Sequence, residues 1–330
     1  MENPIHELLC ELDIHPVLVD IGAAGPPPEI WDGIAPQSIY VGFDPDLRQI
    51  EEVSDGQFHR GIMVNEAVTA SSEKQLSFYL TKSASCSSTL KPDTDSLGNY
   101  TFADLFKVEK EVKVPATTLN SVIERFALPG IDWFKTDSQG TDLRLFESLR
   151  DEIGSRVLAV DIEPGLIDAY VGEDLFVGAH AALIRKGFWL SNLNVCGTVR
   201  MRSANLETIA HLGALERAEI EGAIRRTPCW VEARYFRTIR SLLEINAGKR
   251  EFVLLWCFAL IDNQPGFALD LALEYERLFG RDQFSQTMLD YPMERIREIA
   301  RPQPEVIPRK LSIGARIIRK LKRLLGQATH

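Results

Sequence analysis

The sequence of 330 residues has few cysteines, no long apolar run and no basic leader, and each absence excludes a class of protein. Its five cysteines are odd in number, widely spaced and without a CxxC pair, which argues against a disulfide framework or a zinc site. The longest apolar run, Phe252 to Ile261, has 10 residues, whereas a bilayer-spanning helix needs about 20. No basic segment precedes an apolar run at the start, so no secretory signal is predicted.

An excess of positive charge is missing as well. Lys and Arg total 37 against 47 Asp and Glu, giving a net charge of −10, whereas nucleic-acid binding needs a basic surface. The hydrophobic share of 45% and the charged share of 25% are those of an ordinary globular chain. We therefore expect a globular, cytoplasmic protein that does not bind nucleic acid.

Short β-rich runs alternate with segments of helical spacing in the first two thirds of the chain. Strands are expected at residues 17–21, 39–43, 62–68, 76–80, 112–114, 131–137, 157–163 and 188–190. Helices are expected at residues 119–126, 142–150 and 175–186. Strands separated by helices pair in parallel through right-handed crossovers, so the predicted fold class is α/β with a doubly wound sheet.

Acidic residues stand at or near the ends of four of these strands, at Asp20, Asp44, Asp137 and Glu163. In doubly wound sheets, ligands bind outside the carboxyl ends of the strands, where the strand order switches. We therefore expect these four side chains to lie near the ligand.

The pattern becomes helical after about residue 202, with helices expected at residues 206–224, 231–245, 251–261, 267–279 and 293–299. The chain is accordingly divided into residues 1–202, which form the ligand-binding domain, a helical appendage at 203–301, and a proline-containing linker with a basic tail at 302–330. Trp230 and Trp256 are interpreted as buried packing residues of the appendage. The appendage either completes the core or provides the interface of a homo-oligomer.

The tail from Arg309 to Leu325 carries seven Lys or Arg residues and no acidic one. Helical spacing would place Ile313, Ile317, Leu321 and Leu324 on one face and the basic residues on the others. This pattern is typical of a helix on an anionic membrane surface, although a solvated terminal helix fits it equally well. A peripheral contact with the inner face of the membrane through residues 309–325 is one prediction.

A glycine-containing turn, Gly22 to Gly25, follows the first strand, and Asp44 follows 22 residues after Gly22. This spacing is typical of a site for a ribose-bearing cofactor, whose hydroxyls the acid would bind. The GxGxxG fingerprint of dinucleotide sites is broken by Ala24, and Pro26 to Pro28 supply no backbone N–H for a pyrophosphate. An acid such as Asp20 also suits a cationic ligand, so the turn favours S-adenosylmethionine over NAD.

The motifs VLVDIGAAG, IYVGFDPD, NEAV, TLNSVIERF, IDWFKTDSQGTDLRLFESL and VLAVDIEP occur in the order seen in FkbM-like methyltransferases, which the sequence resembles over residues 14–195. The most specific block is KTDSQGTD at residues 135–142. The resemblance implies a Rossmann-like, class I methyltransferase with a mostly parallel seven-stranded sheet flanked by helices, its last strand antiparallel, here with a C-terminal helical extension. It further implies O-methylation by S-adenosylmethionine of a sugar, glycan or secondary metabolite hydroxyl.

Carried onto this sequence, the resemblance makes a cofactor site of Asp20, Gly22, Ala23, Gly25, Asp44, Glu66 and Ala67. The turn residues would contact the methionine side, Asp44 the ribose, and Glu66 and Ala67 the adenine. Asp137 would face the transferred methyl group. The family often has Asn at position 24 and Glu at positions 139 and 142, where this chain has Ala24, Gln139 and Asp142.

Methyl transfer to a hydroxyl needs a group that takes up the hydroxyl proton. Asp137 is the preferred candidate, Glu163 the second, and His180 the third, because a helix position suits a packing histidine. Lys135 would neutralise Asp137 or contact the substrate. The polar loop from Ser85 to Thr89 either covers the acceptor or is simply solvated.

A divalent metal is left open by the sequence. Asp137 and Glu163 could share a cation, but no ligand motif such as HExxH is present, and no metal ligand is assigned.

Two other functions remain compatible with the pattern. One is a nicotinamide-dependent reductase of a sugar nucleotide, which the broken fingerprint disfavours. The other is a non-catalytic methyltransferase fold that serves as a scaffold in a glycan-assembly complex and would not bind S-adenosylmethionine.

Overall fold

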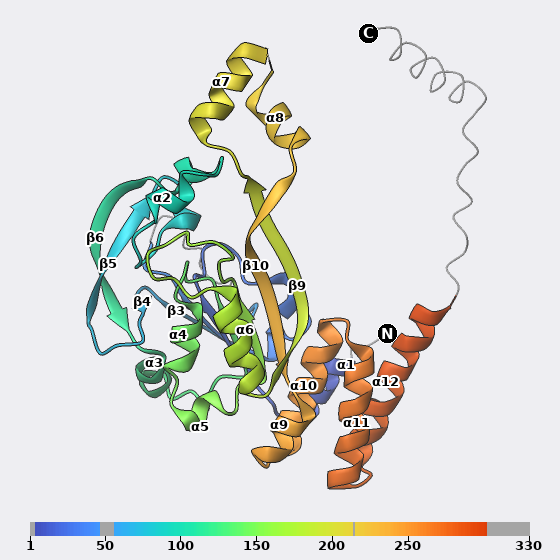
Figure 1. Cartoon of the computed structure of the whole chain (residues 1–330). Coiled ribbons are helices and arrows are strands. Elements are labelled where there is room, and N and C mark those ends of the chain that lie inside the picture. The colour runs from blue at the N-terminus through green and yellow to red at the C-terminus, as the bar shows by residue number, and fades with distance from the viewer. Residues whose placement is uncertain (1–3, 47–55, 214, 302–330) are drawn as a thin grey trace, which may run out of the picture.

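The computed structural model describes residues 4–46, 56–213 and 215–301. Its centre is a seven-stranded sheet with the order β3-β2-β1-β7-β8-β10-β9 (Figure 1). The strands are β1 (Val17–Ile21), β2 (Ile39–Phe43), β3 (Arg60–Val64), β7 (Trp133–Thr136), β8 (Ala159–Ile162), β9 (Phe188–Val199) and β10 (Arg226–Arg237). The first five strands in this order of space run parallel, and β10 is antiparallel to both of its neighbours. The predicted α/β class, the seven-stranded sheet and its antiparallel last strand are confirmed.

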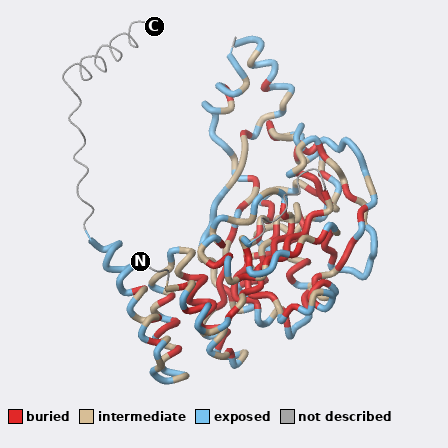
Figure 2. Tube along the Cα trace, turned by 180° about the vertical axis from the view of Figure 1, so that it is seen from behind, coloured by how far each residue is buried: buried red, intermediate tan, exposed pale blue. Residues whose placement is uncertain are grey.

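The central strands are apolar because helices cover both faces of the sheet. All five residues of β1 are buried, and the same holds for most of β2, β7 and β8. Alternate side chains enter opposite cores, so Leu18 and Trp133 face one core and Val19 and Phe134 face the other. Figure 2 shows this buried centre inside an exposed periphery.

One face of the sheet is covered by α3 (Leu119–Arg125), α4 (Asp142–Glu147), α5 (Asp151–Gly154) and α6 (Phe176–Arg185). The other face is covered by α1 (Pro4–Glu11), α10 (Lys249–Ile261), α11 (Pro265–Phe279) and α12 (Gln283–Ala300). The guanidinium of Arg250 in α10 donates two hydrogen bonds of 2.8 Å to Asp132, at the start of β7. The C-terminal helices are therefore part of the layer that closes the sheet.

The helix expected at residues 231–245 is a strand followed by a short helix. Residues 231–245 are not helical throughout, because β10 runs to Arg237 and only α9 (Ile239–Glu244) follows it. Tyr235 of β10 pairs with Val160 of β8 on one side and with Leu190 of β9 on the other. The domain boundary expected at residue 202 stays a prediction. The central sheet nevertheless includes β10, which lies after that residue in the sequence.

A smaller sheet with the order β4-β6-β5 lies beside the main one (Figure 1). It contains β4 (Ala67–Val68), β5 (Gln75–Thr81) and β6 (Val108–Thr117), so the expected strand at 62–68 is two strands in two sheets. Between β5 and β6 lie the short helices η3 (Ala84–Cys86), α2 (Thr94–Leu97) and η4 (Ala103–Phe106). This insertion forms one wall of the site described below.

Helices α7 (Ser203–Gly213) and α8 (Arg217–Ala223) connect β9 to β10 and project from the body (Figure 1). They replace the single helix expected at 206–224. No helix within the described residues is long and apolar enough to cross a membrane. The linker and the tail at 309–325 lie outside the described residues, so their proposed membrane contact stays a prediction.

Candidate active site

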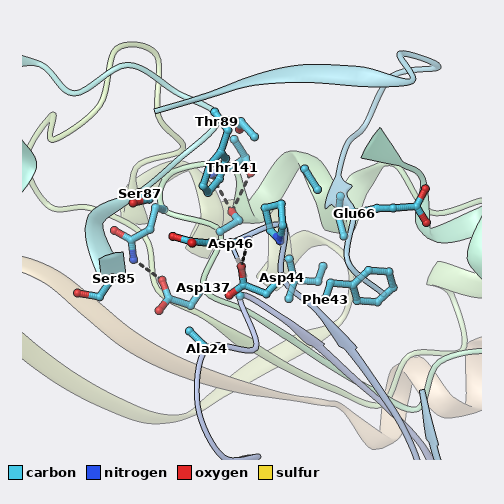
Figure 3. Close-up of a pocket in the computed structure, with 18 of the residues that line it drawn as sticks. Ala24, Phe43, Asp44, Asp46, Glu66, Ser85, Ser87, Thr89, Asp137 and Thr141 are labelled. Atoms are coloured by element: carbon cyan, nitrogen blue, oxygen red, sulfur yellow. Dashed lines mark hydrogen bonds between the residues drawn. The ribbon is translucent and has the colours of Figure 1, made fainter. Parts of the chain in front are cut away.

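A cavity of about 230 Å³ opens at the carboxyl ends of β1, β2 and β7 (Figure 3). Residues from the turn after β1, the end of β2, the loop before β4, the η3 region and the end of β7 line it. They are Ile21, Gly22, Ala24, Phe43, Asp44, Pro45, Asp46, Glu66, Ala67, Val68, Phe78, Ala84, Ser85, Ser87, Thr89, Lys135, Asp137, Ser138, Gln139 and Thr141. The expectation that strand ends bring the acids to one edge is confirmed for Asp44 and Asp137.

The turn after β1 packs directly against the end of β7. The backbone N–H groups of Gly22 and Ala23 both donate to the Phe43 carbonyl oxygen at 2.9 Å. Gly22 has a φ of 80°, and a β-carbon there would overlap the carbonyl oxygen of Asp137. Glycine is therefore required here by both the backbone conformation and the close approach of the two strands.

Asp44 is a buried carboxylate in the wall of the cavity, with 6% of its surface exposed. Its Oδ1 accepts a hydrogen bond of 2.6 Å from the backbone N–H of Asp46, which fixes the side chain at the end of β2. Glu66 and Ala67 line the same cavity. The Glu66 carboxylate forms an ion pair of 2.6 Å with Arg125 and points away from Asp44 and Asp137 (Figure 3).

Asp20 lies behind the cavity, outside the set of residues that line it. Its Oδ1 lies 2.7 Å from Nζ of Lys135, and its Oδ2 accepts a hydrogen bond of 3.0 Å from the Tyr40 hydroxyl. Burial lowers the pKa of Lys135, but the carboxylates of Asp20 and Asp137 more than offset this, so the pKa is raised. Asp20 thus keeps Lys135 charged at the cavity wall.

Asp137 is half-buried at the end of β7, where Gln139 holds it. The side-chain amide of Gln139 donates to Oδ1 of Asp137, and its Oε1 accepts a hydrogen bond of 2.7 Å from the Tyr170 hydroxyl. Burial raises the pKa of Asp137 to about 6, and the charge of Lys135 limits the rise. A carboxylate with this pKa is ionised at neutral pH and can accept a proton.

Glu163 follows β8 and shares the electrostatic environment of Asp137 and Lys135. Burial and the charge of Asp137 raise the pKa of Glu163 to about 9, while Lys135 lowers it. At neutral pH Glu163 therefore keeps its proton, whereas Asp137 is ionised. Among the residues that the structure describes, no group of three His, Cys, Asp or Glu side chains is arranged to hold a metal ion.

Asp142 has a structural role next to Asp137 and Glu163. Its carboxylate accepts hydrogen bonds from the Thr136 hydroxyl, the Ser138 backbone and hydroxyl, and the Glu163 backbone N–H. These bonds tie the end of β7 to the end of β8. His180, the third candidate base, lines neither this cavity nor the one that adjoins it. Its Nδ1 is 3.1 Å from the Tyr235 hydroxyl.

A second cavity, of about 320 Å³, adjoins the first and shares Ser85, Asp137 and Gln139 with it. Its other lining residues are Cys86, Phe102, Leu105, Phe106, Gly140, Glu163, Gly165, Ile167, Ala169, Tyr170, Glu173, Cys229, Trp230 and Glu232. The expected loop at 85–89 therefore lies between the two cavities. Trp256 is fully buried as expected, but Trp230 is not a buried packing residue, since it is half-buried and lines this cavity.

Two site residues had no signal in the sequence. Tyr170 lies in a loop without periodic pattern, and Trp230 lies just before the helix expected at 231–245, in what is strand β10. The loop after β8 and the place of β10 beside β8 bring them to the cavity that Asp137 also lines.

Residues 37–188 match the family model described as the methyltransferase FkbM domain. This part of the chain is therefore similar to the methyltransferase FkbM domain. No curated protein and no solved structure matches the chain in the same comparisons. The matched residues include β2 to α6 and contain Asp44, Asp137 and Glu163, while the Gly22 turn and the Trp230 strand lie outside them. The similarity to this domain suggests a methyltransferase.

Proposed function

We propose that the protein is an S-adenosylmethionine-dependent O-methyltransferase that acts on a hydroxyl of a sugar, glycan or secondary metabolite. The observation that carries this proposal is the pair of cavities at the carboxyl edge of the sheet, which share Asp137 and Gln139. The first cavity suits the methyl donor and the second suits the acceptor. Asp137 stands at their common wall, where a methyl group and a hydroxyl would meet.

The residues of the first cavity fit S-adenosylmethionine better than a dinucleotide. Asp44 offers a buried carboxylate to ribose hydroxyls, and the Gly22 turn leaves no room for a side chain between β1 and β7. Among the described residues that line the cavity, Lys135 is the one basic residue, and Asp20 already pairs with it. A pyrophosphate would therefore lie beside the carboxylate of Asp137 without a free basic side chain among the described lining residues, which disfavours the nicotinamide alternative.

When bound, S-adenosylmethionine would supply a methyl group on a sulfonium sulfur, which keeps the electron pair of the broken bond. Asp137 would accept the proton of the acceptor hydroxyl, and Gln139 would keep its carboxylate turned toward that proton. Holding the acceptor in line is the larger task of the protein, since proximity and orientation can supply about 7–11 kcal/mol. Glu163, protonated at neutral pH, would donate a hydrogen bond rather than accept the first proton.

Calorimetric titration with S-adenosylmethionine tests the cofactor. We expect binding by the wild-type protein and at least a 10-fold weaker affinity for Asp44→Ala, because the ribose hydroxyls lose a charged hydrogen-bond partner worth about 1.5–3 kcal/mol. Asp95→Ala, an exposed carboxylate in α2, is the matched control and should bind normally. A folded wild-type protein that does not bind would favour the scaffold alternative.

The pH dependence of methyl transfer tests the base. Asp137 is protonated below its pKa of about 6 and ionised above it, so kcat/KM should rise as the pH increases through about 6. In Gln139→Glu a second carboxylate would face Asp137, raise its pKa, and move this rise to higher pH. An unchanged pH profile in Gln139→Glu would show that Asp137 is not the titrating group.

A further inference from the structure

The second cavity has a continuous aromatic wall that the reaction itself does not require. The rings of Trp230 and Phe102 are stacked with centroids 6.3 Å apart, and Phe102 meets Phe106 edge to face at 5.1 Å. Phe106 in turn meets Tyr170 at 5.6 Å. The wall thus joins β10, the η4 helix and the loop at Tyr170, three segments far apart in the sequence.

Carboxyl groups complete the lining, and none of the lining residues within the described part of the chain is Lys, Arg or His. Glu163, Glu173 and Glu232 belong to the loop after β8, the loop before α6 and strand β10. Oε1 of Glu173 is buried and has no hydrogen-bond partner among the described residues, while Oε2 accepts one of 3.0 Å from the Tyr170 backbone N–H. Glu232 accepts a hydrogen bond of 2.9 Å from the Asn194 side chain.

This lining discriminates between acceptor chemistries. An anionic acceptor would bring like charge against Glu232 and the ionised form of Glu173 and is disfavoured, whereas Glu163 keeps its proton at neutral pH. A cation is attracted by the aromatic ring faces and by the carboxylates that line the cavity. Burial raises the pKa of Glu173 to about 7, which is the behaviour of a carboxyl group without a countercharge.

We propose that the acceptor is a hydroxylated cation, an amino sugar or amino alcohol whose ammonium group lies between the aromatic wall and the pair Glu173 and Glu232. Its hydroxyl then points to the wall shared with the first cavity, beside Asp137. This inference rests on the proposed methyltransferase function and narrows its substrate class. The positive charge would anchor the acceptor and leave the neutral hydroxyl at the reacting position.

Choline and 3,3-dimethylbutan-1-ol test the inference, because they have the same shape and differ in the charge of the quaternary centre. Binding is measured at pH 8, where Glu173 is ionised, by calorimetry on the full chain with and without S-adenosylhomocysteine. We expect choline to bind at least 10-fold more tightly than the neutral alcohol. Equal binding of the two probes, tighter binding of the alcohol, or no binding of choline would overturn the inference.

Variants that remove a charge test which residues cause the preference for choline over the neutral alcohol. Glu173→Gln and Glu232→Gln should each reduce the preference for choline at least threefold, and the double variant should abolish it. Glu111→Gln, which removes one negative charge from the exposed surface of β6, should leave the preference unchanged. Should the double variant keep the full preference, the cation would bind elsewhere and the inference would fail.

The two proposals fail separately in this design. Loss of the choline preference with intact S-adenosylhomocysteine binding contradicts only the acceptor class. Absence of S-adenosylhomocysteine binding contradicts the methyltransferase proposal, and the acceptor inference falls with it even where choline binds.

Discussion

Replacing Asp137 with Asn should lower kcat by about 10²- to 10⁴-fold while leaving the Kd for S-adenosylmethionine nearly unchanged. Asn has the shape of Asp but cannot accept a proton from the acceptor hydroxyl. The group lies in the wall common to both cavities, and its pKa of about 6 suits a base at neutral pH. Transfer of tritiated methyl groups into an extract of small molecules from the source cells measures turnover without a known acceptor.

The matched control is Asp95→Asn, the same chemical change at an exposed position in α2. It should keep wild-type turnover, and thermal unfolding of both variants checks that they fold. A turnover of Asp137→Asn within threefold of wild type would exclude Asp137 as the base. Glu163, whose pKa is raised by burial and by the charge of Asp137, would then be the next group to replace.

Gly22→Ala should abolish measurable binding of S-adenosylmethionine and destabilise the fold more than Gly25→Ala does. Both glycines have positive φ angles, 80° and 94°, so an alanine is strained at either position. Only at Gly22 does the new β-carbon meet the Asp137 carbonyl oxygen, whereas nothing lies within 4 Å of it at Gly25. The difference in free energy of unfolding between the variants should be about 1–3 kcal/mol, the usual cost of overpacking.

Urea denaturation followed by circular dichroism gives this difference, and calorimetry gives the affinity. Because the two variants share backbone strain, their difference isolates the contact between the turn and β7. Equal destabilisation of the two variants would mean that the turn moves away from β7 at no cost, and the argument from close packing would be wrong.

Much of the carboxyl edge of the sheet, where the two cavities lie, was predictable because strand ends can be recognised in a sequence. Asp44 and Asp137 directly follow buried strands, and parallel pairing brings such positions together. The partnership of Asp20 was not predictable in this way. Asp20 faces Lys135 across neighbouring strands, and this register exists only once β1 and β7 are known to be adjacent.

The misinterpretation of residues 231–245 has a different cause. Buried and less buried residues alternate from Cys229 to Tyr235, which is the period of a strand, but α9 follows almost at once. The apolar pattern of the two elements together fits a helix. Residues 226–237 form a strand because they pair with β8 on one side and β9 on the other. These long-range pairings cannot be recognised from the local spacing of apolar residues.

The position of β10 late in the sequence, far from its partner β8, also affects how the chain folds. Asp161 of β8 and Arg234 of β10 are directly paired and joined through a two-pronged ion pair, although 73 residues separate them along the chain. During synthesis, β8 is made well before its partner, and its open edge has no neighbour until residue 237 has left the ribosome. Such non-local pairing slows folding and exposes an unpaired edge to other chains. The order of synthesis therefore makes Trp230 and Glu232, which β10 contributes to the second cavity, the last part of the site to form.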